Sequence, residues 1–198
     1  MTSYISYIFA YGGLILAESR AMTLGATSTA TPVMLHGFER FWGFAAPDYG
    51  LTSLSLRMNP DKQCAGVLFP ITAPQLALLD VREAGYERVM VAAQDIFYPF
   101  VPEFEPINGR IFTYIAHAKS HPTPANPIVQ SEVDAILTGC LREHGEPFAR
   151  EVVRTTSGWE SPWLNDRQAP RFPFSHHNQT LISLIDRILA DLLVFRQG

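Results

Sequence analysis

Two short stretches of the sequence hold residue types that could form one reactive site. The first is the glycine pair Gly12-Gly13, which follows apolar residues 7–10, a run whose aromatic and β-branched side chains predict a strand. Neither glycine has a Cβ, so the backbone amides of the loop can turn toward a bound anion. The alternative is an ordinary turn, which is the commoner use of two glycines after a strand.

The second stretch carries a carboxylate, Glu83, at the end of a predicted helix. Thr72-Ala73-Pro74 predicts the start of that helix and Gly85 its end. The helix dipole disfavours negative charge there, and Asp80 lies on the same face, so we expect a raised pKa for Glu83. Such a carboxylate suits general-base chemistry. The alternative is a solvated surface glutamate, which is the usual role of a glutamate in such a position.

A loop over residues 155–171 is rich in aromatic and charged side chains and is the best second candidate. Four of its residues could close over a substrate as a lid or bind a distal carboxylate: Trp159, Trp163, Arg167 and Arg171. Alternatively, Asn165, Asp166 and Arg167 form a packing network that pins the tail to the rest of the protein. The packing network is the favoured interpretation.

No metal or cofactor site is predicted. Most histidines are scattered, and the adjacent pair His176-His177 cannot share one helical face. The chain has no HExxH, GxSxG or phosphate-loop motif. Cys64 and Cys140 lie far apart with no ligand spacing, so they are interpreted as buried thiols in a reducing compartment.

Strands and turns dominate the part of the chain that must position the two stretches. Residues 33–44 are a predicted strand with a break near Gly37, and residues 86–93 and 110–118 are two more. A hairpin is predicted from residues 51–56 and 64–71, with Asn59-Pro60-Asp61 as its turn.

Helices dominate after residue 120. Helical spacing runs from Ile128 to Gly145, a short helix is predicted over residues 148–154, and a last helix begins near Asn178. The wide apolar stripe of the last helix predicts packing on the core, with a homodimer interface as the alternative. We therefore expect an α+β protein with a domain over residues 1–120 and a mainly helical extension over residues 121–198.

Composition narrows the function classes. The 198 residues are 47% apolar and 17% charged, which is typical of a single well-buried globular protein. A net charge of −4, a pI near 5.8 and only two lysines argue against a nucleic-acid partner. No basic residue precedes the apolar N-terminal run and no stretch is long enough to span a membrane, so a cytoplasmic protein without a membrane partner is expected.

The two stretches together resemble the γ-glutamylcyclotransferase-like superfamily. Tyr11-Gly12-Gly13-Leu14-Ile15 is similar to the Tyr-Gly-Ser-Leu signature of that superfamily, except that Gly13 replaces the serine. Leu79-Asp80-Val81-Arg82-Glu83, followed by Gly85-Tyr86, is similar to its catalytic segment and to the ChaC branch specific for glutathione. The resemblance covers about residues 4–118.

The resemblance implies a fold, a reaction and roles for several residues. The fold would be a small mixed β-barrel with flanking helices, and the reaction would cyclise a γ-glutamyl group to 5-oxoproline and release an amine without a cofactor. Glu83 would be the catalytic acid–base group. The substrate-binding residues would be Tyr11, Gly12, Gly13, Leu14 and Ile15, with Tyr86 and Tyr114 as pocket walls.

Two functions from different classes follow. The first is a γ-glutamylcyclotransferase acting on glutathione or another γ-glutamyl compound. The second is a non-catalytic module on the same fold that binds a carboxylate or a partner protein, an alternative motivated by Gly13 and the unmatched tail.

Overall fold

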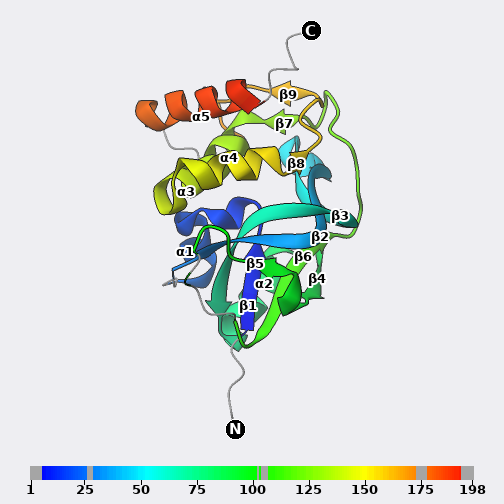
Figure 1. The fold of residues 1–198 in the computed structure, drawn as a ribbon. Coiled ribbons are helices and arrows are strands. Elements are labelled where there is room, and N and C mark those ends of the chain that lie inside the picture. Colours follow the sequence, from blue (N-terminus) through cyan, green and yellow to red (C-terminus); the bar gives the residue numbers. More distant parts are fainter. Residues whose placement is uncertain (1–5, 26–28, 102, 104–106, 173–177, 193–198) are drawn as a thin grey trace.

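A strongly curled mixed sheet forms the lower part of the protein in Figure 1, and the helices that follow residue 120 form a layer above it. The computed structural model describes residues 6–25, 29–101, 103, 107–172 and 178–192. The strands of the main sheet are β1 Ser6–Ala10, β2 Thr31–Ala46, β3 Leu51–Ile71, β4 Tyr86–Val91, β5 Ile96–Phe97, β6 Arg110–Ala116 and β8 Thr156–Ser157. Their order is β4-β6-β1-β3-β2-β5, with β8 added beside β2.

Most neighbouring strands are antiparallel, but β1 pairs with β6 in parallel, as β8 does with β2. The short strands β7 Ile128–Val129 and β9 Trp163–Leu164 pair separately. The α-helices of the described residues are α1 Ala17–Leu24, α2 Ala73–Arg82, α3 Gln130–His144, α4 Glu146–Arg154 and α5 Gln179–Leu192. The single-turn 3-10 helices are η1 Gly13–Ile15, η2 Pro47–Tyr49 and η3 Ala93–Asp95. The predicted α+β class and curled, barrel-like sheet are confirmed.

The centre of the sheet is one long hairpin of β2 and β3, which corrects the predicted one. The turn of this hairpin is η2, closed by Gly50 in the left-handed conformation at φ 62°. β3 is continuous, and both of its halves pair with β2. Residues 59–62 bulge out of the ladder opposite Gly37, where β2 breaks at φ 79°. The Asn-Pro-Asp chemistry therefore makes a bulge within a strand instead of a turn between strands.

The helices formed where their apolar periodicity and capping residues indicated. The hydroxyl of Thr72 accepts from the amide of Gln75, whose side chain accepts from the amide of Thr72, which is a capping box. Helix α3 ends at His144 with Gly145 as its C-cap, and α4 begins at Glu146. Asn178 caps α5 by accepting from the amides of Thr180 and Leu181.

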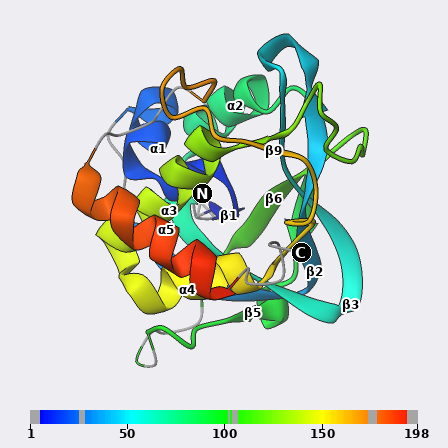
Figure 2. The same ribbon diagram turned by 90° about the horizontal axis from the view of Figure 1, so that it is seen from above.

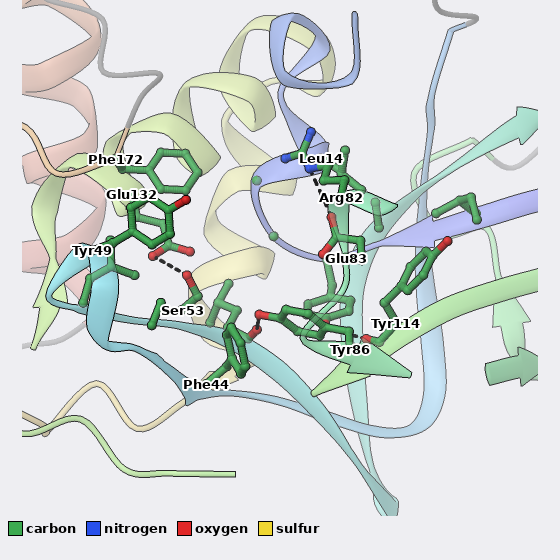
Figure 3. Close-up of a pocket in the computed structure, with 18 of the residues that line it drawn as sticks. Leu14, Phe44, Tyr49, Ser53, Arg82, Glu83, Tyr86, Tyr114, Glu132 and Phe172 are labelled. Atoms are coloured by element: carbon green, nitrogen blue, oxygen red, sulfur yellow. Dashed lines mark hydrogen bonds and ion pairs between the residues drawn. The ribbon is translucent and has the colours of Figure 1, made fainter. Parts of the chain in front are cut away.

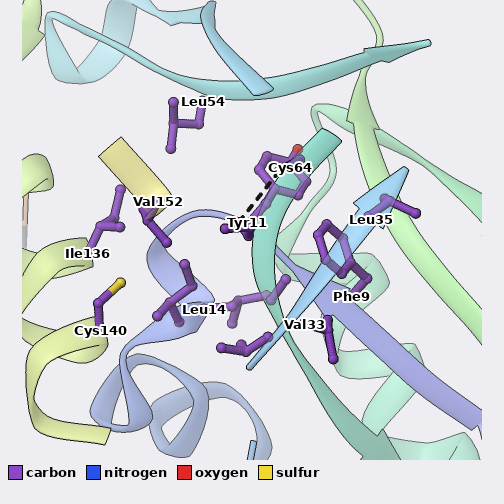
Figure 4. Close-up of a cluster of buried hydrophobic side chains, with 14 of the residues drawn as sticks. Phe9, Tyr11, Leu14, Val33, Leu35, Leu54, Cys64, Ile136, Cys140 and Val152 are labelled. Carbon is purple, nitrogen blue, oxygen red and sulfur yellow. Dashed lines mark hydrogen bonds between the residues drawn. The ribbon is translucent and has the colours of Figure 1, made fainter. Parts of the chain in front are cut away.

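One apolar core joins the sheet to the helices beyond residue 120. Figure 4 shows side chains from β1, β2 and β3 gathered with others from α3 and α4. Both cysteines are fully buried free thiols, as expected. Helix α5 turns Ile185, Ile188 and Leu189 inward, and Figure 2 shows it across α3 and α4. A homodimer through α5 remains a prediction. No helix in the described ranges is long and apolar enough to cross a membrane.

Candidate active site

A cavity of about 330 Å³ opens between the sheet, the start of α3 and the segment that precedes α5. Its size is at the lower end of the range for small-molecule pockets. Figure 3 shows its walls, which are mostly apolar and aromatic with two carboxyl groups among them. The residues that line it include Gly12, Gly13, Leu14, Phe44, Tyr49, Leu51, Ser53, Leu54, Arg82, Glu83, Tyr86, Tyr114, Glu132, Arg171 and Phe172.

The glycine loop forms one wall of this cavity. It leaves β1 and tightens at once into η1, whose turns use the amides of Ile15 and Leu16 as donors. The amides of Gly13 and Leu14 do not donate within these turns. Ile15 itself is fully buried in the core and is not a lining residue, so of the predicted loop residues it alone does not contact the cavity.

Two buried contacts fix the position of the loop. Arg40, which is completely buried, donates to the carbonyl oxygen of Tyr11 at 3.1 Å and to that of Ala65 at 2.6 Å. Helix α3 crosses the far end of the loop at Gly139, where a Cβ would lie 2.8 Å from the backbone of Leu16. The glycine in α3 is therefore needed for this close approach.

Glu83 faces the same cavity as the glycine loop. It caps the C-terminal end of α2, and its side chain is 18% exposed. The Nε of Arg82 lies 3.1 Å from its Oε1. Arg82 is held in turn by the carbonyl oxygen and hydroxyl of Ser19, each at 2.9 Å, and by the hydroxyl of Thr23.

The pKa of Glu83 is raised, as expected, but the cause differs from the expected one. Burial is the main cause, because it disfavours the charged form, and Arg82 acts against it. Asp80 points elsewhere: it accepts from Arg88 at 2.6 Å and from the hydroxyl of Tyr114 at 2.9 Å. The carboxyl group therefore owes its raised pKa to the cavity wall rather than to a like charge on its helix.

The two predicted tyrosine walls both line the cavity. Tyr86 donates from its hydroxyl to the carbonyl oxygen of Leu54 at 3.0 Å, and its ring packs against Phe44 with ring centres 4.6 Å apart. Tyr114 accepts at its backbone carbonyl from the hydroxyl of Tyr11 at 2.6 Å. Tyr11 is thereby fixed between the glycine loop and β6.

Of the four residues predicted as a lid, only Arg171 lines the cavity. Trp159 is 9% exposed, and it stacks on Trp163 with ring centres 5.5 Å apart. Arg167 pairs with Asp134 of α3 and Asp186 of α5, at 2.7 Å in each case. These contacts match the favoured interpretation of this loop as a packing network.

Phe172, which follows Arg171, takes the space beside Gly13. A Cβ at Gly13 would lie 3.0 Å from the Cζ of Phe172, a distance that would force the ring to move. Gly13, which stands where the resembling signature has serine, thus lies against the aromatic ring of Phe172 from the C-terminal part of the chain. This contact gives the Gly13 substitution a steric reason.

A second carboxyl group, Glu132, was missed by the sequence reasoning. It lies in the first turn of α3, is 3% exposed, and accepts from the hydroxyl of Ser53 at 3.1 Å. Burial and the charge of Asp166 raise its pKa to about 8, against the hydrogen bond from Ser53. The sequence does contain a signal for this residue. Glu132 lies four positions before Ile136 and eight before Cys140, which places an acidic side chain on the buried face of the predicted helix.

No group of three or more His, Cys, Asp or Glu side chains is placed to hold a metal ion within the residues that the structure describes. The pair His176-His177 lies outside those residues.

The fold of this chain is similar to that of a solved γ-glutamyl cyclotransferase structure, so the predicted fold is confirmed. A solved structure named gamma-glutamyl cyclotransferase superposes with a TM-score of 0.60 at 16% identity, over 91% of this chain and 98% of that one. An uncharacterised human protein superposes with a TM-score of 0.59 at 15% identity, over 91% of this chain and 97% of that one. YkqA from Bacillus subtilis superposes with a TM-score of 0.55 at 16% identity, over 76% of this chain and 53% of YkqA. Comparison of the sequence with models of protein families and with curated proteins found no match.

Proposed function

We propose that this protein is a γ-glutamylcyclotransferase-type enzyme that cyclises a γ-glutamyl group to 5-oxoproline and releases the attached amine. The observation that carries the proposal is that Glu83 and the glycine loop line one cavity, as the reaction requires. Glutathione, γ-glutamyl amino acids and γ-glutamylamines are the candidate substrates.

In the proposed reaction, Glu83 first takes a proton from the α-ammonium of the glutamyl group. The freed amine attacks the γ-carbonyl carbon, a new C–N bond closes the five-membered ring, and the bond to the leaving nitrogen breaks. Glu83 returns its proton to that nitrogen, and the second proton that the ring nitrogen must lose is passed to the departing amine, which leaves as an ammonium ion. The two protons lost by the α-ammonium are thus the two gained by the leaving group, and the carboxylate is regenerated. A raised pKa makes the carboxylate a stronger base for the first transfer and brings its pKa closer to neutral pH, where one group can both take up and return a proton.

The glycine loop would stabilise the oxyanion that forms at the attacked carbonyl. Its amides are fixed by Arg40 and α3, and fixed donors stabilise a developing charge without reorganising during the reaction. A single donor of this kind contributes about 3 kcal/mol in enzymes where it has been removed. Gly13 keeps its amide although it lacks the serine hydroxyl.

The test is release of 5-oxoproline from γ-glutamyl compounds by the purified protein. We expect Glu83→Gln to lower kcat by about 100-fold or more, the range for loss of a general acid–base group, while circular dichroism and thermal unfolding stay close to wild type. Glu87→Gln is the matched control, because Glu87 is exposed on β4 and does not line the cavity. Absence of 5-oxoproline from all three substrate classes would refute the proposal.

A second candidate is a non-catalytic module that binds a γ-glutamyl group or another carboxylate. The ring of Phe172 beside Gly13 favours it, because that ring takes space next to the proposed oxyanion loop. Thermal stabilisation by γ-glutamyl compounds without any turnover would support this candidate over the first.

A further inference from the structure

The second carboxyl group of the cavity has no role in the reaction proposed above. Glu132 comes from α3, and Figure 3 places it on the side of the cavity away from Glu83, next to Ser53, Tyr49 and Phe172. Since Glu83 and the glycine loop would hold the glutamyl end, the other side is left for the amine that departs. Glu132 is thus placed to contact the leaving group.

Among the residues that the structure describes, no cationic side chain pairs with Glu132. In the described part of the chain, its carboxyl group has a hydrogen bond from Ser53 and forms no ion pair. Asp166 caps α3 nearby by accepting from the amide and hydroxyl of Ser131 at 2.8 and 2.6 Å, which adds a further negative charge. A buried carboxyl group in such a place is costly unless a partner reaches it.

The two arginines of the cavity are already engaged. Arg82 pairs with Glu83 and donates to Ser19 and Thr23. Arg171 donates from its side chain to the carbonyl oxygen of Gly50. Neither of these described arginines pairs with Glu132, so a positive charge on a ligand would meet an unpaired carboxylate there.

The wall between the two carboxyl groups is apolar and aromatic. Phe44, Leu51, Leu54 and the ring of Tyr86 line it. Both carboxylates raise the pKa of Tyr86, which places its phenol within electrostatic reach of each. A ligand complementary to this wall would have a hydrocarbon chain that ends in a positive charge.

We propose that Glu132 selects substrates whose leaving amine carries a second ammonium group, so that the preferred substrates are γ-glutamyl diamines. This inference rests on the proposed function for the orientation of the substrate. Glu132 would accept hydrogen bonds from the distal ammonium, and the alkyl chain of the diamine would lie along Phe44, Leu51 and Leu54. Peptides such as glutathione, whose leaving group carries a carboxylate, would be disfavoured by the same residue.

A matched pair of ligands tests the inference without changing Glu132. N-(γ-glutamyl)-1,4-diaminobutane and N-(γ-glutamyl)pentylamine have the same length, and differ in a terminal ammonium against a methyl group. The titration uses the Glu83→Gln variant, whose turnover should be at least about 100-fold slower. Calorimetric titration of this variant at pH 8.5 should give at least tenfold tighter binding of the diamine compound. Equal affinities, or tighter binding of the pentylamine compound, would overturn the inference.

The variant Glu132→Gln in the same background shows whether this residue is the cause. It keeps the size of the side chain and a carbonyl acceptor for Ser53, and it should reduce the preference for the diamine compound to about twofold or less. A preference that survives this substitution would overturn the assignment to Glu132. Glu87→Gln, outside the cavity, is the control and should keep the full preference.

The same two ligands separate failure of this inference from failure of the proposed function. If wild type releases 5-oxoproline equally fast from both compounds, the proposed reaction stands and the role of Glu132 falls. If the diamine compound binds preferentially but neither compound is turned over, the reaction falls and the recognition of the ammonium stands.

Discussion

The buried carboxyl group of Glu132 makes a quantitative prediction about stability that does not depend on any activity. Its pKa is about 8 in the folded protein against an ordinary value of 4.5. Between these two values the folded state binds more protons at this site than the unfolded state. Stability that is present at low pH is therefore lost as the pH rises from about 4.5 to about 8.

The size of the loss follows from the same two values. Each step of one on the pKa scale corresponds to about 1.4 kcal/mol, so the complete cost is about 5 kcal/mol, of which about 4 kcal/mol falls between pH 5 and pH 8.5. The side chain is only 3% exposed, so solvent screens little of this cost. Glu132→Gln removes the ionisation and should escape the loss.

Urea unfolding of wild type and Glu132→Gln at pH 5, 7 and 8.5 measures the effect. We expect the two free energies of unfolding to lie close together at pH 5, and the variant to be more stable by about 4 kcal/mol at pH 8.5. Cysteines and tyrosines titrate in both proteins, so their contributions cancel in the difference. A gap that stays constant or narrows with rising pH would refute the burial argument for Glu132.

Three further predictions concern Glu83 and the glycine loop. The acid limb of kcat/KM should lie above pH 4.5 because burial raises the pKa of Glu83, and Arg82→Gln should move that limb to still higher pH in a pH–rate profile. Gly13→Ser should destabilise the protein by about 1–3 kcal/mol in urea unfolding, and Phe172→Leu should recover most of this loss in a double-mutant cycle. Gly139→Ala should cost about 1–3 kcal/mol in the same assay, because its methyl group would meet backbone that cannot move aside.

The parts of the site that could be predicted from sequence are those with local signals. The glycine loop directly follows a strand. Glu83 follows a helix whose start is indicated by Thr72 and whose end is indicated by Gly85. The resemblance, and no local signal, predicted that the glycine loop and Glu83 lie together, because strands β2 and β3 separate them in the sequence. The direction of the pKa shift of Glu83 was predicted, but from the helix end and the charge of Asp80, whereas burial is the main cause.

The parts that could not be predicted depend on contacts between distant segments. Asp80 was a plausible neighbour for Glu83 on one helix, but Arg88 and Tyr114 from the adjacent strands bind it. The turn residues 59–62 could not show that a strand continues through them, because their partner across the sheet is the break at Gly37. Glu132 was overlooked because only the packing of α3 shows which side of the helix faces the cavity.

The close approach of α3 to the glycine loop has a consequence for how the chain reaches its native state during synthesis. The loop leaves the ribosome well before the helix that rests on Leu16, which includes Gly139 and ends at His144. Contacts between segments so far apart in sequence form late, because the intervening chain must first be ordered. The earliest part of the site to be translated is thus fixed only after α3 has emerged.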